Sequence, residues 1–405
     1  MIRVDFRRVF VISGLTSLVI VYPVLWARMI SRTVERTGAD FIAFYAAGRI
    51  AQNEGPGHVY DLDLQRHYEE QVVGFAILPE HISPYLHPPF VVPIAQLVSG
   101  DNFIFSFILW NLVMLAFLVG GTIPLLSLFW EGLDRKEKMI LLASILLFYP
   151  SFVSLINGQD SAILYLGGCL WLVGLLKKKD WLAGLGLTIM AVRPHIALPL
   201  ALPFLFRRRE VWWWFLLDAC LLGGLTLAYA GVQGTAGFLQ ILLVSGGGVN
   251  YHTGEINMLN LIGLLERLLP AVSPNHIRWF GWGAYAASLI SLCVLWARRQ
   301  QLGEKEFSLA VLLSLFTAPH FHFHDFVLLI VPIACLMLTL RRELYMPAKN
   351  AVLLPLIISL ALLFSYFTKF LKDSISYIVM LFLLLALWIP GRMFLKKGVT
   401  DRESP

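Results

Sequence analysis

Long runs of apolar residues recur along this chain from one end to the other. A helix needs about 20 mostly apolar residues to cross the hydrocarbon core of a bilayer, so repeated runs of that length leave few folds open. Hydrophobic residues make up 58% of the sequence and charged residues only 14%, a balance that excludes an ordinary soluble domain. We therefore predict an all-α, polytopic integral membrane protein.

Ten apolar segments approach the length of a full membrane span, and we predict a single polytopic membrane domain over residues 1–405. Their approximate bounds are 9–27, 103–130, 139–156, 162–176, 212–230, 279–296, 307–318, 326–340, 351–367 and 375–394. The first segment follows a basic start and lacks the small residues of a cleavage site. We expect it to be a retained signal anchor.

Basic residues gather in alternate connections between these segments. They are Arg3, Arg7 and Arg8; Arg135, Lys136 and Lys138; Lys177 to Lys179; Arg207 to Arg209; Arg298, Arg299 and Lys305; Arg341 and Arg342; Lys396 and Lys397. Because cytoplasmic loops carry the excess of Lys and Arg, these connections should lie inside and the long loop 28–101 outside. The net charge of +6 then needs no nucleic-acid partner. We expect a multi-pass protein of the cell (inner or plasma) membrane.

The segment 181–206 breaks the alternation, because basic triplets stand at both of its ends. Arg193-Pro194 divides it into halves that are too short to span the membrane separately. We predict a broken, re-entrant helical hairpin with its tip at membrane depth, where non-helical backbone must be buried in protein or line a cavity. An Arg at this depth costs about 2.5 to 3.5 kcal/mol on insertion scales, so Arg193 should face a phosphate or pair with an internal carboxylate.

The outward loop carries an amphipathic helix that begins at Asp40 and includes Tyr45. A carboxylate held just above a bilayer is well placed to deprotonate a hydroxyl group. Asp is also a favoured N-cap residue, so Asp40 can equally start a helix without any chemical role. The same loop continues through Tyr60-Asp61 to His87-Pro88-Pro89, with more aromatic and ionisable residues than a simple connector needs.

Two other connections that should face outward are polar. Asn157-Gly158-Gln159-Asp160 is a tight turn that turn chemistry alone explains, with Asp160 as the next N-cap. The segment 246–257 begins with three consecutive glycines but has no following Lys-Ser/Thr, so it is not a phosphate-binding P-loop.

His320, His322 and His324 alternate with Phe residues and are followed by Asp325. Such a set can ligate a transition metal, but a polar wall of a binding site is the interpretation we favour. The four cysteines lie inside apolar segments without metal-binding or disulfide spacing. We therefore assign no metal ligand and expect no cofactor, while a divalent metal stays open.

Together these motifs resemble glycosyltransferase family 87, whose members are polyprenol-phosphate-sugar-dependent mannosyl- and arabinosyltransferases of GT-C fold. The resemblance runs from about residue 38 to residue 340 and rests on short motifs in a shared order. They are Asp40, Tyr60-Asp61, His87-Pro88-Pro89, Gly158-Gln159, Arg193-Pro194-His195, Asn257 with Asn260, and Pro319-His320 through Asp325. The family commonly has Lys where this chain has Arg193, which keeps the charge but changes the geometry available to a phosphate.

The resemblance implies an inverting transfer of a hexosyl group, by the family's example mannosyl, from a polyprenyl-phosphate sugar to a lipid or glycan acceptor on the outward face. Asp40 corresponds to the general base. Arg193, His320 and His324 are the candidates for binding the donor phosphate. We further predict substrate contacts from Tyr45, His87, Gln159, His195 and Asn257.

Two other classes of function stay open on the sequence alone. A secondary transporter or flippase of a lipid-linked or anionic solute also uses broken helices and intramembrane Arg residues, although no second copy of the Arg193-Pro194 break is evident. A structural protein of the cell envelope would need no converging polar groups. Solute uptake into liposomes without glycosyl transfer would favour the transporter, and activity that survives the simultaneous loss of Asp40, Arg193 and His320 would favour the structural protein.

Overall fold

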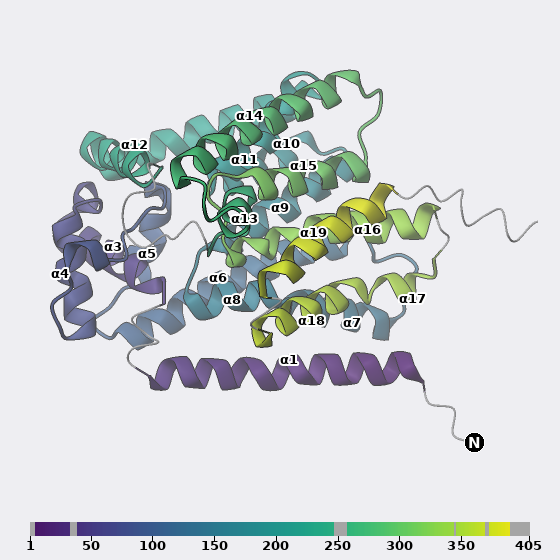
Figure 1. Cartoon of the computed structure of the whole chain (residues 1–405), viewed down its shortest axis with the longest axis horizontal. Helices are drawn as coiled ribbons and strands as arrows, with labels where there is room; N and C mark the ends of the chain where they lie inside the picture. Colours follow the sequence, from purple (N-terminus) through teal and green to yellow (C-terminus); the bar gives the residue numbers. More distant parts are fainter. Residues whose placement is uncertain (1–4, 33–38, 247–256, 344–345, 369–371, 389–405) are drawn as a thin grey trace, which may run out of the picture.

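A computed structural model describes residues 5–32, 39–246, 257–343, 346–368 and 372–388 of the chain. Every regular element within these ranges is a helix, and the long helices run roughly parallel to one another (Figure 1). The short helices α3, α4 and α5 lie together at one end of the bundle, and the start of α1 lies at the other. The predicted all-helical fold is confirmed.

The described residues include six helices or helix pairs long and apolar enough to cross a membrane. They are α1 (Phe6–Ser31), α6 (Phe103–Leu126), α12 (Arg209–Gly246), α14 (Pro274–Arg298), η6 with α16 (Phe323–Leu329 and Ile330–Glu343), and α17 with α18 (Ala348–Ala351 and Leu354–Phe367). Helices α7 (Arg135–Leu146) and α8 (Tyr149–Asn157) meet at a bend of 40° and make a seventh candidate if they count as one span. Several apolar helices therefore indicate a multi-pass membrane protein.

The predicted count of ten full spans is not supported by these lengths. The remaining apolar helices include α9 (Ser161–Leu176), α10 (Asp180–Met190), α11 (Pro194–Ala201), α15 (Glu304–Thr317) and α19 (Lys372–Trp388). Helix α9 has 16 residues and is about 24 Å long, shorter than a hydrocarbon core of about 30 Å. Most of its side chains are buried against other helices, and such burial gives an apolar run just as contact with lipid does.

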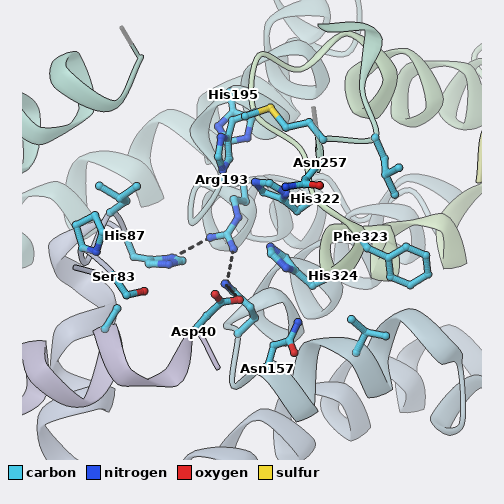
Figure 2. A pocket seen from close by; sticks show the side chains of 18 of the residues that line it. Asp40, Ser83, His87, Asn157, Arg193, His195, Asn257, His322, Phe323 and His324 are labelled. Atoms are coloured by element: carbon cyan, nitrogen blue, oxygen red, sulfur yellow. Dashed lines mark hydrogen bonds between the residues drawn. The ribbon is translucent and has the colours of Figure 1, made fainter. Parts of the chain in front are cut away.

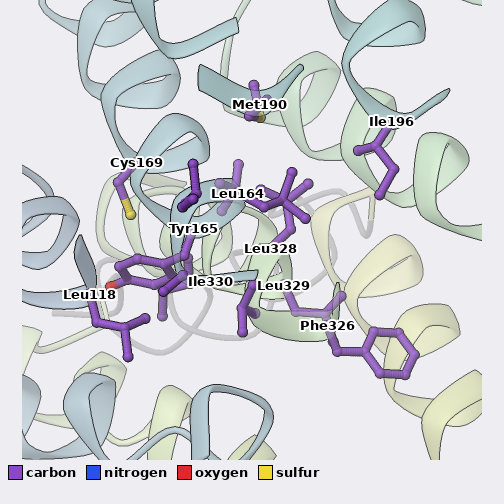
Figure 3. Packing of buried hydrophobic residues seen from close by; sticks show 14 of the residues in the cluster. Leu118, Leu164, Tyr165, Cys169, Met190, Ile196, Phe326, Leu328, Leu329 and Ile330 are labelled. Carbon is purple, nitrogen blue, oxygen red and sulfur yellow. The ribbon is translucent and has the colours of Figure 1, made fainter. Parts of the chain in front are cut away.

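Helix α9 lies at the centre of the core, packed against α6, α10, α16 and η6. Figure 3 shows apolar side chains of this core, among them Leu164 and Tyr165. The Tyr165 hydroxyl lies 2.8 Å from the Thr122 hydroxyl, so its buried polar atom is paired. Glycines bring α9 and α10 close, because a Cβ at Gly186 would lie 2.5 Å from the backbone nitrogen of Trp171. The segments that form the site extend from this closely packed centre.

The segment between the two basic triplets runs into the bundle and returns. Helix α10 ends at Met190, Arg193 precedes α11, and the short helix η4 (Leu202–Leu205) completes the return. Arg208 then donates through Nε to the Asp180 carboxylate at 2.6 Å and through Nη1 to the Leu175 carbonyl at 2.9 Å. Both ends of the segment therefore lie at the same end of the bundle, with Arg193 near the turn. The depth of this turn in a bilayer stays a prediction.

The outer segment consists of α3 (Phe41–Asn53), α4 (Leu62–Val73), α5 (Val92–Val98) and three short 3-10 helices, η1 (Pro56–His58), η2 (Pro79–His81) and η3 (Pro89–Val91). Helix α4 holds the connection before η3 by hydrogen bonds from backbone groups. The Gln65 side chain accepts from the Tyr85 N–H at 2.9 Å, and Glu69 accepts from the Ser83 N–H at 3.1 Å. This connection forms part of the cavity described next.

Candidate active site

A cavity of about 1890 Å³ lies where the outer segment meets the helix bundle. Its wall comes from segments far apart in the sequence, and Figure 2 shows several of its polar side chains pointing toward one another. The lining includes Asp40, His87, Gln159, Arg193, His195, Asn257, His320, His322 and His324. The fold thus brings together the sequence-predicted site residues, with one exception.

The exception is Tyr45, which does not line the cavity. Its hydroxyl donates to the Gly100 carbonyl at 2.8 Å, and its ring packs against Phe41 and Phe103. Tyr45 is five residues after Asp40 on α3, which turns its side chain to the face that packs on the bundle. It is a packing residue, and the predicted substrate contact from Tyr45 is not retained.

Asp40 stands at the start of α3 but does not cap it. Its backbone is helical, with φ −62° and ψ −16°, and among the described residues its side chain makes no capping hydrogen bond. Oδ2 instead accepts a hydrogen bond from Nε2 of Gln159 at 2.7 Å. The carboxylate is therefore held at the cavity wall by a neutral amide, and the N-cap explanation for Asp40 does not describe its side chain.

The turn between α8 and α9 sets this contact. Gly158 has φ +68°, in the left-handed region that favours glycine, and it lies against Phe41. A Cβ at position 158 would be only 2.4 Å from the Phe41 Cβ. Because Phe41 directly follows Asp40, the missing side chain lets Gln159 reach the Asp40 carboxylate.

Arg193 is buried, with 7% of its surface exposed, and all three of its nitrogens have partners. Nη2 lies 2.8 Å from Oδ1 of Asp160 and donates to Oε1 of Gln159 at 3.3 Å. Nε donates to Oδ1 of Asp325 at 3.3 Å, and Nη1 lies 3.0 Å from Nδ1 of His87. The guanidinium is thus paired with two internal carboxylates, the non-phosphate role that the sequence left open for it.

Asp160 and Asp325 are the carboxylate partners of Arg193, a pairing that the sequence analysis did not identify. Asp160 stands at the N-cap position of α9, as the sequence predicted, but in the described part of the chain its side chain makes no capping hydrogen bond. Oδ1 instead faces Arg193, Oδ2 faces His87, and the residue is fully buried. Burial alone would raise the pKa of Asp160, but Arg193 and His87 lower it to about 2. The signal in the sequence was Arg193 itself, since a cation buried among apolar helices requires carboxylate partners close to it in the fold.

Four of the histidines that line the cavity, His195, His320, His322 and His324, form a continuous row. Ring centroids lie 6.3 Å apart between His195 and His320, 4.6 Å between His320 and His322, and 5.7 Å between His322 and His324. The intervening Phe321 is fully buried, and its carbonyl accepts from the Leu259 N–H at 3.0 Å. The local backbone at His322 is extended, so the flanking residue Phe321 points into the core while the side chain of His322 points toward the cavity. Phe323 lines the cavity together with the histidines.

Burial lowers the pKa of His322 to about 4, with a smaller effect from the neighbouring His324. The pKa of His320 is also well below its usual value, first because of burial and then because of His322 and His195. Without a bound anion, these imidazoles are uncharged near neutral pH. The row therefore offers neutral hydrogen-bonding groups beside a charged Arg193.

The cavity also has apolar walls on two sides of the polar centre. One comes from α1 and α8 and contains Leu25, Met29, Phe152, Val153 and Ile156; the other comes from α12 and α14 and contains Phe238, Leu242, Leu243, Trp279 and Trp282. Figure 1 shows α1 and the pair α12 and α14 on opposite flanks of the bundle. A ligand with both an anionic and a long apolar part would match such walls.

The described residues contain no group of three or more His, Cys, Asp or Glu side chains arranged to hold a metal ion. In the same ranges all four cysteines are free thiols, and Cys169 and Cys335 are buried. The side chain of Asn260, which the sequence pattern grouped with Asn257, caps α13 (Leu261–Leu268) by accepting from the Gly263 N–H at 2.9 Å. Asn257 lines the cavity, while residues 247–256 of the same loop are outside the described ranges.

Comparison with known proteins gives one match. The family model described as glycosyltransferase family 87 matches residues 85–321, more than half of the chain. The matched region contains His87, Gln159, Arg193, His195 and His320, whereas Asp40 and His324 lie outside it. No curated protein and no solved structure matches the chain.

Proposed function

Since the chain belongs to glycosyltransferase family 87 and is therefore a membrane glycosyltransferase, we propose that it uses a polyprenyl-phosphate sugar as its donor. It transfers a hexosyl group, with mannose the first candidate, to a lipid or glycan acceptor. The observation that carries this proposal is the cavity itself, in which Asp40, Arg193 and the histidine row converge between two apolar walls.

In the proposed reaction Asp40 is the general base. The acceptor oxygen attacks the anomeric carbon, its proton passes to the Asp40 carboxylate, and the bond from the anomeric carbon to the phosphate oxygen breaks. The electron pair of that bond leaves with the lipid phosphate, and attack from the opposite face inverts the anomeric centre. A positioned base contributes about 10² to 10⁴ of the rate enhancement. The bond from Gln159 to Oδ2 of Asp40 supports this role, because it fixes the carboxylate without neutralising it.

The leaving lipid phosphate becomes a monoester and gains negative charge. Positive potential from Arg193 and hydrogen bonds from His320 and His324 stabilise that charge, as preorganised donors do at other sites of developing charge. His87, Gln159, His195 and Asn257 line the same cavity and are proposed to contact the two substrates.

The polyprenyl chain accounts for the membrane fold. A sugar attached to a long apolar carrier stays in the bilayer, so its enzyme needs an apolar wall that leads to a polar centre. Both apolar walls of the cavity meet this requirement. No phosphate-binding glycine loop of the nucleotide-sugar type is present in the sequence.

We further propose that the site faces the outside of the cell membrane. Basic connections pack against one another at the end of the bundle opposite α3 to α5: Arg342 pairs with Glu304 at 2.9 Å, and Lys305 pairs with Glu343 at 2.9 Å. Since cytoplasmic connections are the basic ones, the cavity at the opposite end faces outward.

The test is transfer by purified protein in detergent or proteoliposomes from a panel of labelled sugar donors. The panel contains polyprenyl-phosphate mannose, glucose, galactose and arabinose, and the corresponding nucleotide sugars, with products identified by mass spectrometry. We expect transfer from at least one lipid-linked hexose and none from nucleotide sugars. Use of nucleotide sugars alone would refute the donor class, and labelled solute uptake without transfer would indicate a transporter.

A further inference from the structure

The group that should bind a donor phosphate most directly, Arg193, is already fully engaged. Nε is directed at Asp325 and Nη2 at Asp160 and Gln159. Nη1 is directed at Nδ1 of His87 and at the Val192 carbonyl, so each of the five N–H donors has a partner. A phosphate oxygen would have to displace one of these partners, and breaking a buried ion pair is costly because it leaves an unpaired charge. The phosphate must therefore find hydrogen-bond donors elsewhere in the cavity.

The histidine row, defined as His195, His320, His322 and His324, is the alternative. It lines the cavity beside Arg193, and the rings lie between 4.6 and 6.3 Å from their neighbours. Nε2 of His195 is buried and has no hydrogen-bond partner in the described part of the chain. A buried polar nitrogen left without a partner is costly, and a ligand oxygen would satisfy it.

The charges around the row favour the binding of a proton together with the phosphate. The charged groups that act on its imidazoles are Arg193, Asp325, Asp40 and Asp160. Carboxylates outnumber the single guanidinium, so neutral histidines would leave an anionic phosphate in a negative environment. Arg28 and Arg278 also line the cavity, but each has interactions of its own.

We propose that the histidine row is the site of the donor phosphate and that it takes up a proton when the phosphodiester binds. This inference rests on the proposed function, since it assigns the phosphate of the donor to particular side chains. The bound anion supplies the negative partner that a buried imidazolium requires, and the imidazolium donates hydrogen bonds to the phosphate oxygens. When the bond between the anomeric carbon and the phosphate oxygen breaks, the same imidazolium faces the negative charge gained by the phosphate monoester. The proton of the acceptor hydroxyl is then on Asp40.

Linkage gives the sign of the effect. The free imidazoles are neutral at pH 7, with the pKa of His322 lowered to about 4 by burial, and binding of the anion raises that pKa. Affinity for the phosphate therefore falls as pH rises. Where uptake is complete, the dissociation constant rises about tenfold per pH unit.

The experiment is calorimetry with farnesyl methyl phosphate, a phosphodiester that has an isoprenyl chain, no sugar and no group that titrates near neutral pH. Binding to the full-length protein is measured at pH 7 in buffers with different enthalpies of ionisation. We expect the apparent enthalpy to depend on the buffer with a slope that approaches one proton taken up. A slope of zero, with affinity independent of pH from 6 to 8, would overturn the proposal.

Variants assign the proton to the row. His322→Gln and His320→Gln keep the size and polarity of the side chain but remove the titration, and each should weaken binding at least tenfold and reduce the uptake. His67→Gln is the matched control, because His67 is exposed on α4 and lies outside the cavity. Proton uptake that persists unchanged in both row variants would refute the assignment to the histidine row. The proton uptake itself is measured on the wild-type protein and so does not depend on the folding of any variant.

The probe separates this inference from the proposed function. If the protein takes up a proton with the phosphodiester but transfers sugar from no donor, the phosphate site is supported and the proposed glycosyltransferase function is refuted. Transfer from a polyprenyl-phosphate sugar without proton uptake would do the reverse. Binding that is lost in Arg193→Gln but unchanged in the row variants would place the phosphate on Arg193.

Discussion

At the scale of single residues, the site is organised around one buried cation. Arg193 holds Asp160 and Asp325 and also the oxygen of Gln159, whose nitrogen in turn holds Asp40. The amide of Gln159 thereby transmits the position of a buried group to the proposed base. In this account the positive charge of Arg193 stabilises the donor phosphate without direct contact, while its hydrogen bonds hold the neighbouring side chains in place.

Replacing Gln159 with Leu tests this link. The substitution leaves the volume similar but removes the donor to Oδ2 of Asp40, so the carboxylate loses its fixed direction. We expect the turnover number to fall about 10- to 100-fold, because one hydrogen bond to a charged group contributes about 1.5 to 3 kcal/mol. Steady-state transfer assays measure the effect.

The control for this variant is Gln71→Leu, on the exposed face of α4. It should retain wild-type turnover. A Gln159→Leu protein that is folded and turns over as fast as the control would show that Asp40 needs no such support.

Residue types in the sequence were enough to predict most of the side chains in the site, but not which of these side chains pair with one another. Asp40, Arg193 and the histidines stand out because charged or titratable residues are rare beside apolar segments. The partnership of Arg193 with Asp160 and Asp325 depends on how α9, η6 and the return at Pro194 pack, across sequence separations that no local pattern encodes. The orientation of Tyr45 likewise depends on which face of α3 packs on Phe103.

At the scale of elements, the turn after α8 and the start of α3 act as one unit. Gly158 is required there for two separate reasons, its positive φ and the close approach of Phe41. The sequence indicated a tight turn, but it gave no sign that this turn sets the distance from Gln159 to Asp40.

Gly158→Ala should therefore reduce transfer at least tenfold, because the new Cβ would lie 2.4 Å from Phe41 and must push Asp40 away from Gln159. Gly74→Ala is a matched control: Gly74 also has a positive φ, of +78°, but nothing lies within 4 Å of a Cβ there. It isolates the backbone strain from the contact. Equal activity in the two variants would contradict the role assigned to the close approach.

Helix α4 makes a pH-dependent attachment to the cavity wall. Glu69 is 2% exposed and accepts from the Ser83 N–H, and burial raises its pKa to about 7, which the Ser83 bond only partly offsets. Because the pKa of Glu69 is higher in the folded than in the unfolded protein, ionisation of this carboxyl group lowers the free energy of unfolding. Stability of the outer segment should therefore fall as pH rises from about 4.5 to 7 and stay low above it, by up to about 3 kcal/mol.

Hydrogen exchange of the segment around Ser83 measures this attachment. Exchange should be slower at pH 5 than at pH 8 after correction for the intrinsic rate, and Glu69→Gln should remove most of the difference. Persistence of the full difference in that variant would exclude Glu69 as its source.

At the scale of the whole molecule, hydropathy predicted the all-helical class of the fold, whereas the predicted count of about ten spans is not confirmed: six or seven candidates lie in the described ranges. Helices buried inside the bundle, such as α9, are as apolar as helices that face lipid, so periodicity cannot separate them. The positions of the breaks at Arg193-Pro194 and between α7 and α8 decide which helices are short. The basic residues predicted that the connections carrying them lie at one end of the bundle. The ion pairs Lys305–Glu343 and Arg342–Glu304, which join two of these connections, lie at the end opposite α3 to α5.

In the proposed reaction, Asp40 removes the proton from the acceptor hydroxyl as the sugar is transferred from its lipid-linked donor. The most direct measurement compares the transfer rate of Asp40→Asn with that of the wild-type protein, using the lipid-linked donor that the wild type accepts. Both proteins are first matched for thermal stability and for binding of the donor. We predict a loss of about 10² to 10⁴ in rate with donor binding retained. A folded Asp40→Asn protein that transfers sugar at the wild-type rate would contradict the account.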